Sequence, residues 1–350
     1  MAVTADTLRI VDRLRLQLTT MTDAQTVALV RAWADAWDVL APDFETAFVE
    51  LLAGAVDGKV SRATVAKNIR LRDAMRATRR MLQELATTAD DVIVNDVGQA
   101  VLDALDGHQA LIGSQLPPNT AGTGVSFTRM DPEALASIVE RTTEQIHSAT
   151  RPLPVDVERV MKRELIRGVA VGENPRATAR RIMRQAEGRF NGGLTRALTI
   201  ARTETLDAHR AATQASEKAN KTILAEWEWH AALNARTCPS CWAKHGTRYP
   251  LDQSGPDDHQ NGRCARVTIT KSWKDLGFDI EEPPSMTKDA EAVFNDLTPE
   301  TQRDIMGAGR LELLQSGKVS WSDLSTKHET DGWRDSYTAT TVKDLAAKAA

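Results

Sequence analysis

Three cysteines and a histidine lie close together in the second half of this 350-residue chain. Cys238 and Cys241 are separated by two residues, and His259 and Cys264 follow in the next turn-rich stretch. Two thiolates at this spacing can reach one cation from a tight turn, and a His and a Cys from a second turn can complete a tetrahedron. The four residues predict a Cys3His zinc site, with His245 as a competing ligand.

The predicted site would be a structural staple, because four protein ligands leave no coordination position for water. A metal would also order a short, turn-rich segment that cannot build a large core. An odd number of thiols argues against a disulfide framework. The alternative is that the three cysteines are small buried hydrophobic residues.

Motifs of several enzyme classes are missing. No histidine is followed two places on by glutamate, and Thr237 stands where a zinc nucleobase deaminase has proline. His328-Glu329 lacks the second histidine of a zinc protease, and no P-loop or G-x-S-x-G elbow occurs. Asp258-His259, followed by Gly262, faintly resembles the start of an HNH nuclease motif, but a second Cys-x-x-Cys pair is absent. We therefore expect no enzymatic activity, with an HNH-like or other metal-dependent nuclease as the alternative.

The rest of the chain has the composition of a helical protein, with 41% hydrophobic but only 5% aromatic residues. Apolar residues recur at helical spacing in the N-terminal third, as in Val27, Val30, Ala34 and Trp37. The alternation of residues 226–230 is instead typical of a strand. The fold class that we predict is mainly α, with helical bundle units and a small, zinc-stapled β-hairpin module near 224–270.

The middle of the chain holds the strongest periodic pattern. Asn174-Pro175 predicts the start of a helix, and Gly188 with residues 191–193 predicts its end. A seam of apolar or small residues with alternating spacings of four and three then follows: Leu194, Leu198, Ala201, Thr205, Ala208, Ala212, Ala215 and Ala219. The seam predicts one long helix at about 193–220, which a neighbouring helix can approach closely.

Breaks rich in Gly and Pro divide the sequence into four expected regions. These are an N-terminal helical region at 1–115, a second helical region at 131–223, the Cys/His hairpin module at 224–270 and an acidic C-terminal helical region at 271–350.

The net charge of −4 is unevenly distributed along the chain. Residues 155–223 carry 14 Lys or Arg and 8 Asp or Glu, whereas residues 271–350 carry 10 and 15. The basic stretch could face nucleic acid or an acidic partner, or it could be a solvated helical face. No stretch reaches the roughly 18–20 apolar residues of a membrane span, and no secretory signal is visible. We expect a protein made in the cytoplasm, without a membrane partner.

Several motifs follow one another in a fixed order within residues 155–270. A helix pair joined by the turn 168–175 precedes Arg196-Ala-Leu-Thr-Ile-Ala-Arg-Thr-Glu-Thr205, and then come Trp229, 234–241 and His259-Gln-Asn-Gly-Arg-Cys264. This order resembles the phage Mu protein F-like family of head-morphogenesis proteins, whose last motif usually reads H-P-N-C-R-C. The chain departs from that motif at Gln260 and Gly262.

The resemblance implies a non-enzymatic minor capsid protein of the virion, assembled in the host cytoplasm. A few copies would lie in the capsid interior near the portal and act in head assembly, DNA packaging or ejection. Its partners would be the portal protein, the major capsid protein and packaged DNA. The resemblance also implies that Arg202 and Glu204 correspond to a charged pair that is typical of the family. We interpret this pair as structural. A DNA-binding protein, suggested by the basic region, is the other alternative.

Overall fold

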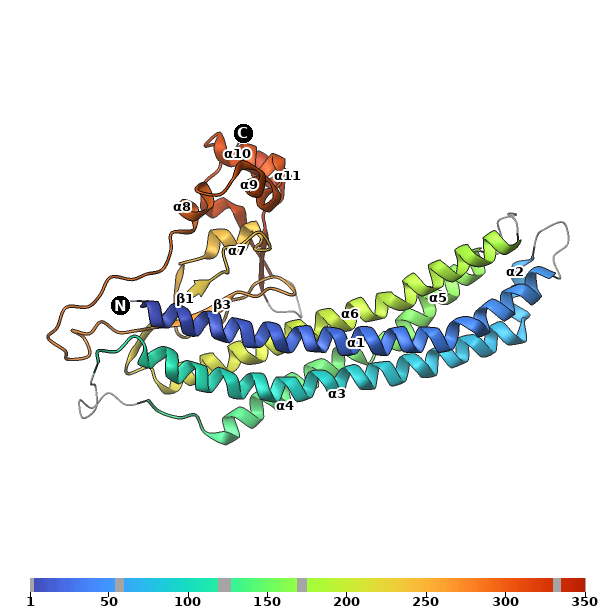
Figure 1. The fold of residues 1–350 in the computed structure, drawn as a ribbon, viewed down its shortest axis with the longest axis horizontal. Coiled ribbons are helices and arrows are strands. Elements are labelled where there is room, and N and C mark those ends of the chain that lie inside the picture. Colours follow the sequence, from blue (N-terminus) through green and yellow to red (C-terminus); the bar gives the residue numbers. More distant parts are fainter. Residues whose placement is uncertain (1–2, 54–59, 119–126, 169–174, 330–334, 350) are drawn as a thin grey trace. The chain divides into compact units, whose positions relative to one another are not determined.

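The computed structural model describes residues 3–53, 60–118, 127–168, 175–329 and 335–349, and Figure 1 shows its elements. Its long helices are α1 (Ala5–Ala53), α3 (Ile69–Gly113) and α6 (Pro175–Ala219). Shorter helices are α2 (Arg62–Lys67), α4 (Pro132–Thr150) and α5 (Leu153–Gly168). The mainly α class with a small β-module is confirmed. Among the described residues, no helix is both long and apolar enough to cross a membrane.

Two compact units are assembled from separate stretches of chain. The first consists of Thr20–Gly98 and Val139–Thr205, and its described elements are helices. The second consists of Met1–Thr19, Gln99–Ile138 and Leu206–Ala350, and it contains both sheets. The long helices contribute one part to each unit.

In the first unit, the buried face of α1 is set by its largest side chains. Trp33 is fully buried, and the Trp37 ring lies 6.3 Å from Phe44 and 5.4 Å from Phe190. The predicted seam through Val27 and Val30 is wrong, since these side chains are 57% and 44% exposed. Apolar residues recur at spacings of three and four on two different faces of this helix. The face that carries the tryptophan rings is the buried one, because its burial removes more apolar surface from water than burial of the valine face would.

Helix α6 runs through the glycines that were expected to end it. At Gly193 the reason is packing against α5: a Cβ on this residue would lie 3.1 Å from Val157 Cγ2 and 3.3 Å from Leu153 Cδ2. The glycine therefore permits a close helix contact and does not act as a cap. Residues 169–174 of the predicted turn lie outside the described residues.

The predicted small-residue seam of α6 is confirmed in its middle. Ala201, Thr205, Ala208 and Ala212 are each at most 2% exposed. Leu198 is only half-buried, as are Leu194 and Ala215. The last member, Ala219, is exposed where the helix ends. The buried face is thus continuous only through the central turns.

The second unit carries a three-stranded antiparallel sheet, with the strand order β2-β1-β3. Its strands are β1 (Leu224–His230), β2 (Arg248–Pro250) and β3 (Ala265–Thr270). The strand predicted at 226–230 is confirmed. One face of β3 packs with the starting part of α1 and the end of α3, through Val3, Val11, Leu111, Val267 and Ile269.

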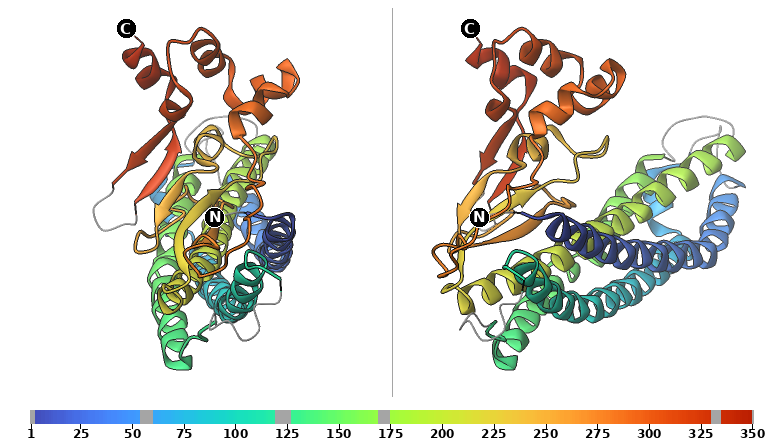
Figure 2. Two further views of the ribbon diagram at one scale, coloured as in Figure 1. Left: turned by 90° about the vertical axis from the view of Figure 1, so that its left-hand side faces the viewer. Right: turned by 60° about the vertical axis from the view of Figure 1, so that its left-hand side comes forward.

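Helix α7 (Pro239–Lys244) joins the sheet to the C-terminal region. Its Trp242 is fully buried in a core with Phe294, Met306, Leu324 and Leu345. The remaining elements of this region are α8 (Ala290–Asn295), α9 (Pro299–Met306), α10 (Ala308–Gln315), the 3-10 helix η1 (Trp321–Leu324), β4 (Ser325–His328), β5 (Ser336–Ala339) and α11 (Val342–Lys348). Figure 2 shows the β4–β5 hairpin beside the three-stranded sheet, where Asp258 forms a bridge with Tyr337.

Candidate metal centre

Three of the four predicted ligands converge. Cys238 is the N-cap of α7, and its sulfur accepts a hydrogen bond of 3.4 Å from the Cys241 backbone nitrogen. Pro239 fits the first helical position, so the Cys-Pro-Ser-Cys segment folds both thiols to one helix end. His259 comes from the loop between β2 and β3. The ligand atoms of Cys238, Cys241 and His259 all lie within 4.8 Å of one another.

Cys264, the fourth predicted ligand, lies beside these three residues, but its sulfur is not among the ligand atoms within 4.8 Å of one another. The residue directly precedes β3 and is 6% exposed, in a cluster with Trp229 and Cys241. Its thiol interacts with that of Cys241. His245, the competing ligand, lies elsewhere: its Nδ1 accepts a hydrogen bond of 3.0 Å from the Ala231 backbone nitrogen. We name Cys238, Cys241, His259 and Cys264 the Cys/His group.

The three converging side chains share protons with one another. Hydrogen bonds from the Cys241 thiol and from His259 lower the pKa of Cys238 to about 4. The hydrogen bond to Cys238 raises the pKa of His259 to about 9, and interactions with Cys238 and Cys264 raise the pKa of Cys241. Without a metal, one thiolate is thus shared by two donors. Zinc would replace their protons, because it binds thiolates and neutral imidazole.

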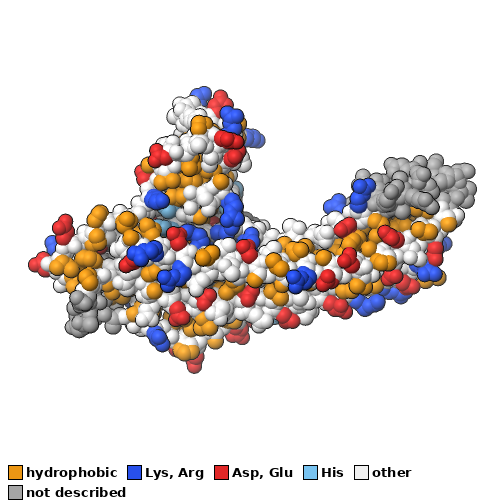
Figure 3. All heavy atoms as spheres, viewed as in Figure 1, with side chains coloured by type: hydrophobic (Ala, Val, Ile, Leu, Met, Phe, Trp, Pro, Cys, Tyr) orange, Lys and Arg blue, Asp and Glu red, His pale blue; other side chains and the backbone are white. Residues whose placement is uncertain are grey.

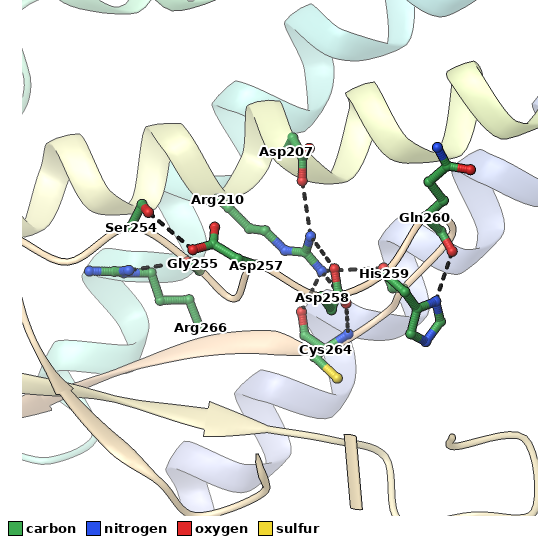
Figure 4. A network of polar contacts seen from close by, with 11 residues as sticks. Asp207, Arg210, Ser254, Gly255, Asp257, Asp258, His259, Gln260, Cys264 and Arg266 are labelled. Carbon is green, nitrogen blue, oxygen red and sulfur yellow. Dashed lines mark hydrogen bonds and ion pairs between the residues drawn. The ribbon is translucent and has the colours of Figure 1, made fainter. Parts of the chain in front are cut away.

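The loop that carries His259 is held by an arginine on α6 (Figure 4). Arg210 donates 2.8 and 2.9 Å hydrogen bonds to the two carboxylate oxygens of Asp258, and another to the Cys264 carbonyl at 2.9 Å. Asp258 in turn accepts from the Cys264 backbone nitrogen. Burial alone would lower the pKa of Arg210, but the charges of Asp258 and Asp207 outweigh it, and the pKa is raised. The guanidinium therefore stays charged and fixes both ends of the loop.

Gly262 is required by this arrangement. A Cβ at residue 262 would lie 2.2 Å from the Asp258 carboxylate. Any larger residue would have to displace a fully buried, ion-paired side chain. The glycine that departs from the H-P-N-C-R-C pattern at this position thus leaves room for the Arg210–Asp258 pair. The sequence motifs did not reveal this pair.

A second buried polar network was also missed from sequence. His108 of α3 contacts Ser216 Oγ at 2.8 Å and Thr268 Oγ1 at 2.9 Å. Thr268 donates to Glu217, whose carboxylate lies 2.7 Å from Arg266 Nη2. Burial, with smaller effects of nearby cations, lowers the pKa of His108 to about 3. A neutral histidine therefore connects α3 and α6 to β3.

The two residues expected to form a structural pair, Arg202 and Glu204, both lie on α6. Arg202 is half-buried, with Nη2 3.7 Å from the Asp23 carboxylate of α1. Glu204 is 9% exposed on the same helix. Both positions are compatible with a structural role in helix packing, which stays a prediction.

The fold and the site together define a mainly helical protein with a small sheet braced by a Cys/His group. Residues 159–267 match the family model described as Phage Mu protein F like protein, which confirms the resemblance predicted from the motifs. The match spans the end of α5, all of α6 and the Cys/His group. No curated protein and no solved structure matches the chain. The family indicates, at a coarse level, a phage head-morphogenesis protein.

Proposed function

We propose that the chain is a non-enzymatic minor capsid protein, which acts in the capsid interior near the portal during head assembly and in DNA packaging or ejection. The observation that carries this proposal is the family match over residues 159–267. The portal protein and the major capsid protein are the proposed partners. Long helices joined to a small, braced module provide the extended surfaces that such contacts need.

In this proposal, the Cys/His group holds a structural zinc ion. Cys238, Cys241 and His259 would supply three ligands, and Cys264, already beside Cys241, would supply the fourth after a small shift. The donor set fits, because thiolate and imidazole are the ligands that zinc prefers. The ion would join α7 to the loop before β3. Because Trp242 of α7 lies in the C-terminal core, the staple would stabilise that core as well.

The alternative of a nuclease finds less support in the site. Asp258 is fully buried and occupied by Arg210, so its carboxylate is not available to a substrate. His259 Nδ1 is hydrogen bonded to the Gln260 carbonyl at 2.8 Å, and the ring also interacts with Cys238. A general base needs access to the proton that it removes. Metal-dependent DNA cleavage that is lost in His259→Ala would overturn the non-enzymatic proposal.

Contact with DNA is a second candidate function, and one surface favours it. Residues 61–81 contain seven Lys or Arg and one Asp. Arg72, Arg76 and Arg80 of α3 are exposed, and Figure 3 shows several blue side chains along the lower right edge, over the start of α3. Both basic stretches contain ion pairs, such as Arg70 with Glu50 here and the buried pair of Arg210 with Asp258 in 155–223. Duplex DNA attracts such a row of cations through its phosphates.

Mass spectrometry of washed procapsids, from the phage that encodes the chain, tests the proposed function. We expect the protein in a few copies per particle, cross-linked to portal protein. Its absence from procapsids, with free protein in the lysate, would contradict the proposal. Charge reversal of Arg72 and Arg80 should leave incorporation unchanged and weaken salt-sensitive DNA binding, which separates the DNA function from assembly.

A further inference from the structure

A pocket of about 160 Å³ opens beside the Cys/His group in the second unit. Three separate stretches of chain line it: the last turns of α1 in this unit, residues 232–241 and residues 259–264. Its lining residues are Arg15, Thr19, Ala232, Asn234, Arg236, Thr237, Cys238, Cys241, His259, Asn261, Gly262, Arg263 and Cys264. The Cys/His group is therefore one wall of a pocket that solvent can reach.

Outside the Cys/His group, the charged side chains of this lining are all positive. Arg15, Arg236 and Arg263 contribute three guanidinium groups, and no Asp or Glu lines the pocket among the described residues. The Cys/His group balances only part of this charge: a thiolate next to a protonated imidazole carries no net charge, and zinc bound by three thiolates and a histidine would carry a single negative charge. The lining of the pocket thus carries a net positive charge.

Two of these arginines, Arg15 and Arg236, can donate further hydrogen bonds to a ligand. Arg15 contacts Asp12 through Nη1 at 2.8 Å, but that carboxylate is 73% exposed and outside the pocket lining. The Nε of Arg15 is buried without a hydrogen-bond partner among the described residues. Arg236 is exposed. The side-chain amide nitrogen of Asn234 adds a neutral donor.

We propose that this pocket binds an oxyanion, specifically a phosphate group. Guanidinium groups present paired N–H donors that match the oxygens of phosphate, and such charge-assisted hydrogen bonds are the stronger ones. The volume is large enough for one phosphate. Free phosphate and the backbone phosphate of a nucleic acid share this chemistry. The inference does not depend on the proposed role in the phage head.

Calorimetric titration of the zinc-loaded full chain with inorganic phosphate tests the proposal. We expect saturable binding that weakens at least tenfold in Arg236→Ala and in Arg263→Ala, while Arg236→Lys retains part of it. Arg303→Ala, an exposed arginine outside the pocket, is the matched control and should bind normally. Zinc content and circular dichroism should be unchanged in all four variants.

Competition between phosphate and a short DNA duplex distinguishes the two sources. Displacement of the duplex by phosphate, lost in Arg236→Ala, assigns the pocket to a backbone phosphate. Phosphate binding without competition assigns it to the free anion. The proposal is overturned by an absence of saturable binding, or by binding that both pocket variants leave unchanged. It is also overturned if the arginine variants lose zinc, because the arginines would then act by stabilising the thiolate ligands and not by binding phosphate.

Discussion

Arg210 and Asp258 form a two-point ion pair, with Nη1 2.8 Å from Oδ1 and Nη2 2.9 Å from Oδ2, although 48 residues separate them. The same guanidinium donates to the carbonyls of Gly262 and Cys264. The loop that presents His259 is therefore positioned by α6, through a residue that is not itself a ligand. Such a buried, multiply bonded pair is costly to break on one side only.

Removing the arginine tests this dependence. Arg210→Ala should lower the free energy of unfolding by about 3–5 kcal/mol, because Asp258 stays behind as a buried, unpaired charge. Zinc affinity should fall as well, since the loop is no longer fixed. The half-exposed pair of Arg196 with Asp156 provides the control: Arg196→Ala should cost at most about 1 kcal/mol. Equal effects of the two variants in urea denaturation would contradict the proposed role of Arg210.

A side chain at residue 262 should damage the same pair. In Gly262→Ala the new Cβ meets the Asp258 carboxylate, and we expect a loss of about 1–3 kcal/mol from overpacking. Gly192→Ala is the matched control, because no atom lies within 4 Å of its Cβ position and alanine favours a helix. Thermal melts should show opposite shifts for the two variants. A Gly262→Ala protein as stable as wild type would show that the loop accommodates the methyl group.

The sequence predicted the features that depend on residues close together in the chain, and it missed those that depend on long-range contacts. Strand β1 and the approach of Cys238 to Cys241 follow from spacing within a few residues. Arg210 could not be distinguished from a solvated arginine, because its partner lies on a distant loop. In the same way, the course of α6 through Gly193 depends on packing against α5, which overrides the usual tendency of glycine to end a helix.

The buried seam of α6 predicts a further mutational response. Ala208 and Ala212 are 1% and 0% exposed, so replacing either with Leu should overpack the helix contact and cost about 1–3 kcal/mol. Ala219→Leu, at the exposed end of the same helix, should be close to neutral. Melting temperatures of the three variants give the comparison. If the Leu residues at 208 and 212 were as well tolerated as that at 219, the seam would not be a packed contact.

Stability should depend on pH through the buried His108. Its pKa falls from 6.5 in the unfolded chain to about 3 in the fold, mainly because burial disfavours the charged ring. Between these values the unfolded chain binds the extra proton, so the stability present above pH 6.5 is lost as the pH falls. The expected slope is up to about 1.4 kcal/mol per pH unit. Urea denaturation at about pH 7.5 and about pH 5 should show a smaller slope in His108→Gln; an unchanged slope would argue against a neutral, buried His108.

The metal content of the purified full chain is the most direct test of the structural account, in which Cys238, Cys241, His259 and Cys264 form a zinc staple. Mass spectrometry for elemental zinc should find a single ion per chain. Cys238→Ser, Cys241→Ser and His259→Ala should lose it, and Cys264→Ser should bind it more weakly. His245→Ala should retain it, since His245 bonds elsewhere. A zinc-free wild-type protein that stays unloaded with excess zinc, or loading that the three ligand variants leave intact, would contradict the account.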